Sequence, residues 1–260
     1  MPDAPALLSA LDRHGVRGVF SDIDDTLTDD GRLDAPTYAA LVRLRHAGRR
    51  VVLITGRPAG WAATLASIFP IDAAVAENGA VAFLPKPGRG LDAIYLDGAD
   101  ERATWPERLQ RIADDVLSLP FAKRSNDTFM RISDVAFDIG ETQHLDADEI
   151  AQIAARIHAH GARYTASTIH AHATYSTANK LVGAELVARV LWGESEESLR
   201  RHYVFVGDSN NDAAAFGGFA RSVGVANVAR HLPRLDAPPK FITTRPSGAG
   251  FVELVDYLLA

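Results

Sequence analysis

The 260-residue sequence predicts an α/β fold, with a doubly wound parallel-sheet (Rossmann-like) core and an inserted α+β cap domain. Two observations predict it. Continuous apolar runs alternate with helical patterns at both ends of the chain, and the middle of the chain lacks this regularity. Apolar strands separated by helices are typical of parallel sheets that are covered on both faces.

The alternation begins near the N-terminus and returns after residue 178. In the first part the pattern predicts strands at 17–24, 49–55 and 72–78, separated by helices at 35–48 and 57–69. In the last part it predicts helices at 179–192, 211–218 and 250–259, with strands at 202–207, 221–226 and 240–244. We expect these segments to form one sheet with helices on both sides.

The middle of the chain contains turn-forming residues typical of a hairpin, with two prolines and two glycines at residues 85 to 90. A helix is predicted at roughly 99–118, a strand at 127–140 and another strand at 163–175. Between these strands, Asp146 and Glu149 form a capping-box pattern that starts a helix ending at Gly161. The prediction is a catalytic core of residues 1–82 and 176–260, with a cap domain of residues 83–175.

The composition excludes several classes of protein. A formal charge of −6 and a pI near 5.8 argue against a nucleic-acid-binding surface, which would show basic clusters. No apolar run is long enough for a membrane span, and the N-terminal segment lacks the pattern of a signal peptide. The absence of cysteine excludes thiolate metal sites and fits a cytoplasmic protein. The oligomeric state is not predicted.

The stretch SDIDDTLTDDG at 21–31 places a dense group of acids directly after an apolar strand. Asp22 and Asp24 can point to the same side of an extended chain. A second acidic turn, GDSNND, follows the strand at 202–207 and offers Asp208 and Asp212. If the two strands are neighbours, these carboxylates meet at one edge of the sheet, where a cation would have to neutralise them. Oxygen ligands without cysteine or an obvious histidine favour Mg²⁺ over zinc.

A calcium loop is a competing interpretation of the second turn. Asp208, Asn210 and Asp212 match the first three ligand positions of an EF-hand. The pattern then fails, because Ala213 replaces the required glycine and Phe219 stands where the bidentate glutamate belongs.

Two further motifs suit a phosphate group. Thr55 and Gly56 end an apolar strand with a hydroxyl and a sterically free backbone N–H, which is good geometry for binding an anion. Lys180 opens a predicted helix and supplies a mobile positive charge. A carboxylate that attacks phosphorus needs such help, because both reactants are negative.

In order, the motifs DIDDTLT, LITGRP, NK and GDSNND resemble the four motifs of the haloacid dehalogenase-like phosphohydrolase superfamily. The ENGA segment at 77–80, with the position and size of the insert, resembles its branch with a large α/β cap, subfamily IIB. That branch holds Cof-type hydrolases, eukaryotic phosphomannomutases and sugar-phosphate phosphatases of the sucrose, trehalose and mannosylglycerate pathways. The resemblance covers nearly the whole chain.

The resemblance implies catalytic roles for Asp22, Asp24, Thr55 and Lys180, and a phosphate-binding role for Gly56. Asp22 would be the nucleophile that forms an aspartyl-phosphate. Asp24 would protonate the leaving alcohol and later deprotonate the hydrolytic water. Thr55, Gly56 and Lys180 would hold the phosphoryl group.

The resemblance also implies a Mg²⁺ site. Asp22, the backbone carbonyl of Asp24, and Asp208 would bind the ion, and Asp212 would belong to the same metal site. Asn211 would support this site and the bound phosphate. The sequence departs from the family at Asp25, where the family usually has glycine; the extra carboxylate puts the local turn and the metal affinity in question.

The cap offers weaker candidates for substrate contacts. His170 and His172 share one face of a predicted strand, which could look into the active site or into solvent, and an H-x-H pair can also bind metal. Arg131 could bind a second polar group of the substrate or lie on the surface. Arg57, beside the phosphate motif, could also contact substrate.

The sequence thus predicts a Mg²⁺-dependent phosphatase acting on a small phosphorylated metabolite, most simply a sugar phosphate. A phosphosugar mutase is the alternative, because the same motifs can transfer a phosphoryl group within one sugar. A non-catalytic metabolite sensor is a third hypothesis; it is disfavoured because every catalytic position is filled.

Overall fold

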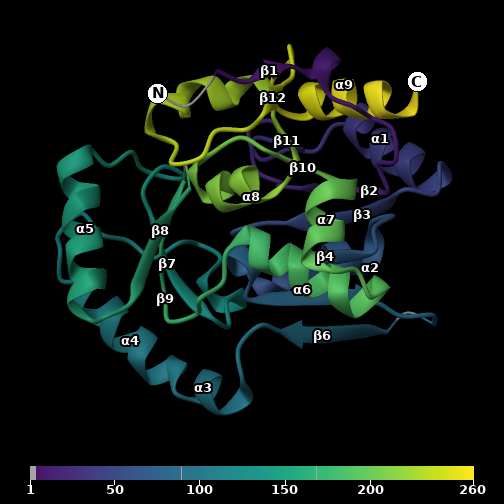
Figure 1. Ribbon diagram of the computed structural model, residues 1–260. Coiled ribbons are helices and arrows are strands. Elements are labelled where there is room, and N and C mark those ends of the chain that lie inside the picture. The colour runs from purple at the N-terminus through teal and green to yellow at the C-terminus, as the bar shows by residue number, and fades with distance from the viewer. Residues whose placement is uncertain (1–3, 89, 168) are drawn as a thin grey trace.

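The computed structural model describes residues 4–88, 90–167 and 169–260, and its largest feature is a nine-stranded sheet (Figure 1). The strand order across this sheet is β1, β12, β11, β10, β2, β3, β4, β5, β6. The strands from β1 across to β4 pair in parallel, whereas β5 and β6 pair antiparallel. The bounds are β1 Ala6–Leu7, β2 Gly18–Ser21, β3 Arg50–Ile54, β4 Ala73–Ala76, β5 Val81–Pro85, β6 Leu91–Tyr95, β10 Tyr203–Gly207, β11 Arg221–Gly224 and β12 Phe241–Ile242.

Helices cover both faces of this sheet, as the sequence predicts. One face packs against α1 (Ala35–His46), α2 (Ala59–Ile68) and α9 (Ser247–Leu259). The other face packs against α6 (Lys180–Trp192), α7 (Glu196–His202) and α8 (Ala213–Gly218). Neighbouring side chains of β2 divide between the two cores, with Val19 in the first and Phe20 in the second, because successive side chains of a strand point to opposite faces.

A second, smaller sheet lies beside the core (Figure 1) and has the order β7, β9, β8. Its strands are β7 Asp134–Asp138, β8 Arg163–Ala166 and β9 His170–Thr174, and the helices of this region are α3 Ala99–Ala103, α4 Trp105–Val116 and α5 Ala147–Ala159. One face of the sheet joins α4 and α5 in a separate apolar core. The capping box predicted at the start of α5 is present. The opposite face is polar and is turned toward the core domain.

The predicted start of the cap, at residue 83, lies inside strand β5 of the large sheet. Strands β5 and β6 extend the large sheet, because β5 pairs with β4 directly after the tight turn at 77–80 and β6 pairs with β5. A boundary at residue 83 would cut through this hairpin. We therefore place the proposed start of the cap after Tyr95, while its end near residue 175 stays a prediction.

Three predicted elements of the cap also differ. The strand expected at 163–175 is a hairpin of β8 and β9, in which the Ser167 N–H donates to the His170 carbonyl (2.9 Å). The strand expected at 127–140 begins with a helical turn and becomes extended only at Asp134. The helix expected at 99–118 divides at Thr104, where Pro106 suits the start of a new helix. Among the described residues, none of the helices has the length and apolarity to span a bilayer.

Candidate active site

The candidate site lies where β2 and β10 end side by side in the large sheet. From β2 the chain winds outward through β3 and β4, and from β10 it winds to the other side through β11 and β12. The strand order therefore reverses between β2 and β10. Ligands of open α/β sheets bind at such a reversal, beyond the carboxyl ends of the strands.

The carboxylates predicted from the two acidic turns do meet at this point. Oxygen atoms of Asp22, Asp208 and Asp212 all lie within 4.8 Å of one another, and the three residues are buried. The Thr26 hydroxyl lies 3.4 Å from both Asp22 Oδ2 and Asp208 Oδ1. A buried set of carboxylate oxygens fits a hard divalent cation.

Lys180 is fully buried and neutralises part of this charge. Its ammonium donates to Asp22 Oδ1 and to Asp212 Oδ1, each at 2.6 Å. Although burial opposes it, the carboxylates of Asp212 and Asp22 raise the pKa of Lys180, which therefore stays protonated. Asp212 Oδ2 accepts the backbone N–H groups of Asp208 and Ser209. Both oxygens of Asp212 are thus engaged within the protein, so Asp212 suits a role in positioning Lys180 better than a role as metal ligand.

One ammonium group does not balance the charge of the three carboxylates in the cluster. Burial raises the pKa of Asp22 to about 7; Lys180 opposes this shift, and the carboxylates of Asp212 and Asp24 add to it. Burial, followed by repulsion from Asp22 and Asp212, also raises the pKa of Asp208 well above its usual value. A cation between these groups would relieve both penalties.

Asn227 is a supporting residue that the sequence did not reveal. Its amide nitrogen donates to Asp208 Oδ2 (3.2 Å) and to the backbone carbonyl of Asp25 (2.9 Å). Its amide oxygen accepts the N–H of Ser247 (2.9 Å). Asn227 therefore joins the two acidic turns to the start of α9. A single asparagine in a turn carries no sequence signal for such a role.

The predicted phosphate loop follows β3. Thr55 is buried, and its hydroxyl accepts the Arg57 N–H at 2.9 Å. Gly56 lines the cavity above Asp22. A Cβ at position 56 would lie only 3.2 Å from Asn78 Oδ1 and 3.5 Å from His172 Nε2, so a larger residue would crowd the loop.

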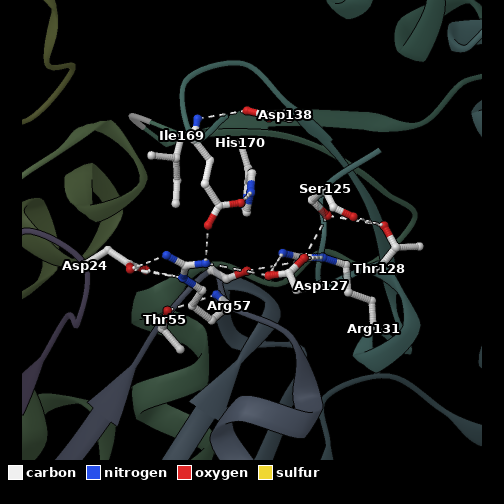
Figure 2. Close-up of polar contacts among 12 residues, drawn as sticks. Asp24, Thr55, Arg57, Ser125, Asp127, Thr128, Arg131, Asp138, Ile169 and His170 are labelled. Carbon is white, nitrogen blue, oxygen red and sulfur yellow. Dashed lines mark hydrogen bonds and ion pairs between the residues drawn. The ribbon is translucent and has the colours of Figure 1, made fainter. Parts of the chain in front are cut away.

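Asp24 does not join the metal cluster through its side chain. The Arg57 guanidinium binds its carboxylate from two nitrogens, with Nη2 to Oδ1 at 2.9 Å and Nε 3.0 Å from each oxygen. Arg57 Nη1 also donates to Glu141 of the cap at 3.1 Å and lies 3.8 Å from Asp127. Figure 2 shows Arg57 between Asp24 on one side and Asp127 on the other. Arg57 thus joins the phosphate loop, the first acidic turn and the cap.

The cap histidines face the site rather than solvent. His170 Nε2 lies 3.0 Å from Glu141 Oε2, and His172 Nδ1 lies 2.8 Å from Asp134 Oδ2. Both rings line the cavity above Asp22. Burial, together with the charges of His172 and Arg131, lowers the pKa of His170.

Arg131 is not a surface residue, because only 1% of its side chain is exposed. Its guanidinium pairs with Asp127 and Asp134 and donates to the carbonyl of Gly56 at 3.1 Å. Arg131 thus joins the cap to the phosphate loop, and its predicted contact with substrate stays a prediction.

Glu77, in the ENGA segment, accepts hydrogen bonds from both the core and the cap. Its buried carboxylate accepts the N–H of Ala59 at the start of α2 (3.0 Å). It also accepts the N–H groups of Ile132 (3.0 Å) and Ser133 (2.6 Å) and the Ser133 hydroxyl, all from the cap. Burial, with repulsion from Asp134, raises the pKa of Glu77 to about 7. The ENGA resemblance marked this segment, but it did not indicate the role of the glutamate.

The cavity above Asp22 is narrow in this conformation. It is lined from the core by Asp22, Asp24, Gly56, Arg57, Asp208, Ser209 and Asn211, and from the cap by Ser167, Ile169, His170 and His172. Its volume of about 10 Å³ holds about one water molecule. A phosphoryl group needs more room, which a movement of the cap away from the core would provide.

The comparison with protein families agrees with the motifs. Residues 19–102 match the profile of the haloacid dehalogenase-like hydrolases. This segment contains the first acidic turn, the phosphate loop and the ENGA segment. The match confirms the resemblance and the class of hydrolase. Among curated proteins, no sequence match is found.

Solved structures share the fold over nearly the whole chain. Protein 0175 of Thermoplasma acidophilum is 16% identical with a TM-score of 0.72, over 95% of this chain and 99% of that one. A sugar phosphatase of HAD subclass IIB is 17% identical with a TM-score of 0.64, over 93% and 98% of the two chains. The sucrose-phosphatase from Synechocystis, solved with sucrose and phosphate, is 16% identical with a TM-score of 0.63, over 94% and 98%. The predicted fold, a Rossmann-like core with a cap, is confirmed.

Proposed function

The chain belongs to the haloacid dehalogenase-like hydrolases, and from that premise we propose that it is a Mg²⁺-dependent phosphatase acting on a small phosphorylated metabolite. The observation that carries the proposal is the buried cluster at the ends of β2 and β10. There Asp22 contacts Lys180, and Asp208 lies beside them. The Asp22 carboxylate can attack a phosphate ester, and the Lys180 ammonium and a cation beside it can stabilise the negative charge of the phosphoryl group.

The residues present fit a divalent cation. Asp22 and Asp208 would hold it through carboxylate oxygens, together with the backbone carbonyl of Asp24. Asp212 and Asn227 would position these ligands and Lys180. When bound, the cation supplies positive charge that offsets the repulsion between the nucleophile and the phosphoryl oxygens.

In the first step, an Asp22 oxygen bonds to phosphorus while the bond to the ester oxygen breaks. Asp24 gives its proton to the departing alcohol. In the second step, Asp24 takes a proton from a water molecule that attacks the aspartyl-phosphate, and the bond from Asp22 to phosphorus breaks to release inorganic phosphate. Lys180 and the loop at Thr55 and Gly56 hold the phosphoryl oxygens through both steps.

Arg57 must release Asp24 before this chemistry can occur, because its guanidinium now covers both carboxylate oxygens. Opening of the cap would separate Arg57 from Glu141 and give the substrate access to Asp24. Closure around the substrate then excludes bulk water from the first step.

The substrate is proposed to be a sugar phosphate, as in the similar structures described as sugar phosphatase and sucrose-phosphatase. The cytoplasmic location stays a prediction from the absence of cysteine.

The test is phosphate release from p-nitrophenyl phosphate with Mg²⁺ and with excess chelator. Activity should require the ion, and Asp22→Asn should abolish it. Asp29→Asn is the matched control: it makes the same chemical change in the same acidic turn, at an exposed residue that does not line the cavity, and should leave turnover unchanged. Wild-type activity in Asp22→Asn would refute the assignment of the nucleophile. A phosphosugar that is isomerised without release of phosphate would instead identify a mutase.

A further inference from the structure

A second hollow of about 410 Å³ lies next to the cavity above Asp22. The two share Asp24, Arg57 and Ile169 in their walls. The alcohol part of a bound phosphate ester must lie beside the group that protonates it, which the proposed function assigns to Asp24. The hollow is therefore in the right place to receive the leaving alcohol. We call it the leaving-group hollow; its lining residues are Asp24, Asp25, Asp30, Gly31, Arg57, Gly140, Glu141 and Ile169.

Negative charges outnumber positive charges around this hollow. Four carboxylates line it, and Arg57 is the one cationic side chain among its described lining residues. The guanidinium of Arg57 is already committed: Nε and Nη2 bind Asp24, and Nη1 binds Glu141. Its carbon also lies 4.9 Å from the centre of the Trp61 ring. Even when Arg57 releases Asp24 for the proposed chemistry, its single positive charge faces four carboxylates among the described lining residues. Arg230 acts on Asp25 from outside this lining. A second anionic group on the substrate would therefore meet a lining with a negative net charge.

The hydrogen-bonding character of the hollow points the same way. An ionised carboxylate only accepts hydrogen bonds, so a ligand beside it must donate them. Hydroxyl and ammonium groups donate, whereas a carboxylate or a second phosphate does not. Two of the lining acids, Asp25 (φ 54°) and Asp30 (φ 47°), stand at left-handed positions that favour glycine.

We propose that the leaving-group hollow selects esters whose alcohol carries several hydroxyl groups or an ammonium group and no second acid. Glu141 of the cap and Asp30 of the core are the residues that enforce this selection from its two sides. The inference rests on the proposed phosphatase function and narrows its substrate class to neutral polyol, sugar and amino-sugar phosphates.

The test compares esters that differ in one charged group, using the Mg²⁺-loaded enzyme at low salt. Glycerol 3-phosphate is paired with 3-phosphoglycerate, and glucitol 6-phosphate with 6-phosphogluconate; glucosamine 6-phosphate supplies the cation. We expect kcat/KM to be about tenfold or more higher for the ester without the carboxylate in each pair. The lining carboxylates repel the extra carboxylate of the other ester over a short distance. Added salt should reduce this ratio, because it screens partly exposed charges.

Variants then assign the selection to residues. Glu141→Gln and Asp30→Asn together should narrow the ratio severalfold, mainly by improving the carboxylate-bearing esters. Asp29→Asn is the matched control, because it removes an acid next to Asp30 that does not line the hollow, and should leave the ratio unchanged.

Three results would overturn the inference. Equal or better turnover of the carboxylate-bearing esters would show that Arg57 exchanges its partners for a substrate anion. If the double variant keeps the full preference for esters without a carboxylate, Glu141 and Asp30 are not the residues that cause this preference. Failure to release phosphate from any of the five esters and from p-nitrophenyl phosphate would refute the proposed function itself, and the inference with it.

Discussion

The two sides of Asp24 differ in how their charges are held. On one side lies the nucleophile cluster of Asp22, Lys180, Asp208 and Asp212, where the Lys180 and Asp212 side chains have 0% exposure. On the other side lies the cap latch, defined as Arg57 with Glu141, where the Glu141 side chain is 29% exposed. Members of the cluster all come from the core, whereas the latch joins the core to the cap.

This difference suggests separate roles, with the cluster suited to the reaction itself and the latch to the entry of substrate. Ions buried without water need fixed partners, because an unpaired buried charge costs several kcal/mol. The latch can open at a lower cost than the cluster, because water screens the Glu141 carboxylate, which is partly exposed, although the Arg57 side chain is buried. If Asp22 and Lys180 act as proposed, the enzyme would keep them fixed while the cap moves to admit each substrate. The predictions below test this contrast, beginning with the cluster.

Loss of the nucleophile should have the largest effect. Asp22→Asn should lower kcat by about 10⁴-fold or more, because no other carboxylate of the cluster can form the covalent intermediate in its place. Rapid quenching followed by mass measurement should detect a phosphorylated wild-type chain and no such species in the variant. A phosphorylated form of Asp22→Asn would contradict the assignment.

Lys180→Met should reduce both activity and stability. It leaves the buried carboxylates of Asp22 and Asp212 without their cation, which costs about 3–5 kcal/mol of unfolding free energy. Denaturant unfolding measures this loss in the metal-free protein. Lys86→Met is the control, because Lys86 forms an ion pair with Asp92 on the surface, where about half of each side chain is exposed; it should change stability by less than about 1 kcal/mol. Similar losses in both variants would refute the contrast.

Glu77→Gln should weaken the contact between core and cap. The amide cannot accept all four hydrogen bonds that the carboxylate accepts, and its NH₂ group would face backbone donors of the cap. We expect a loss of about 1–3 kcal/mol in unfolding free energy and faster proteolysis within the cap. Glu253→Gln is the matched control, because Glu253 accepts the N–H groups of Thr244 and Arg245 at the surface. An equal loss in both variants would deny Glu77 a special role.

Divalent cations should stabilise the protein more as the pH rises. The pKa of Asp22 is about 7 in the folded metal-free chain and near 3.8 when unfolded. Between these values the folded state keeps a proton that the unfolded state has lost, so metal-free stability falls as the pH rises through this window. Cations compete with that proton. The increase in Tm caused by Mg²⁺ should therefore be larger at pH 7.5 than at pH 5.5; a constant increase would contradict the prediction.

Opening the latch should have the smallest effect. Glu141→Gln removes the charge of a partly exposed carboxylate that contacts both Arg57 and His170, so unfolding free energy should change by about 1 kcal/mol, less than for Lys180→Met. Turnover of p-nitrophenyl phosphate should change only severalfold, mainly in KM. A loss as large as that of Lys180→Met would show that the latch belongs to the fixed chemistry of the site.

Sequence patterns predicted the core better than the cap. The parallel strands follow apolar runs with local signals, and Asp22 and Asp208 meet because β2 and β10 end at one edge of the sheet. In the cap, alternation at 163–175 did not reveal the reversal that makes β8 and β9 separate strands. The hairpin pattern at 85–90 did not assign β5 and β6 to the large sheet, because such a pattern does not specify which sheet the hairpin joins.

By itself, the sequence determined the family, the fold of the core and the residues that we propose to react with phosphate, because these depend on short motifs at the ends of strands. Only the tertiary structure decided the partners of those residues. It paired Arg57 with Asp24 and Glu141, placed Arg131 on Gly56, and buried Glu77 against Ser133. Such contacts join segments far apart in the chain, and their geometry depends on how two packed units meet, which no local pattern encodes.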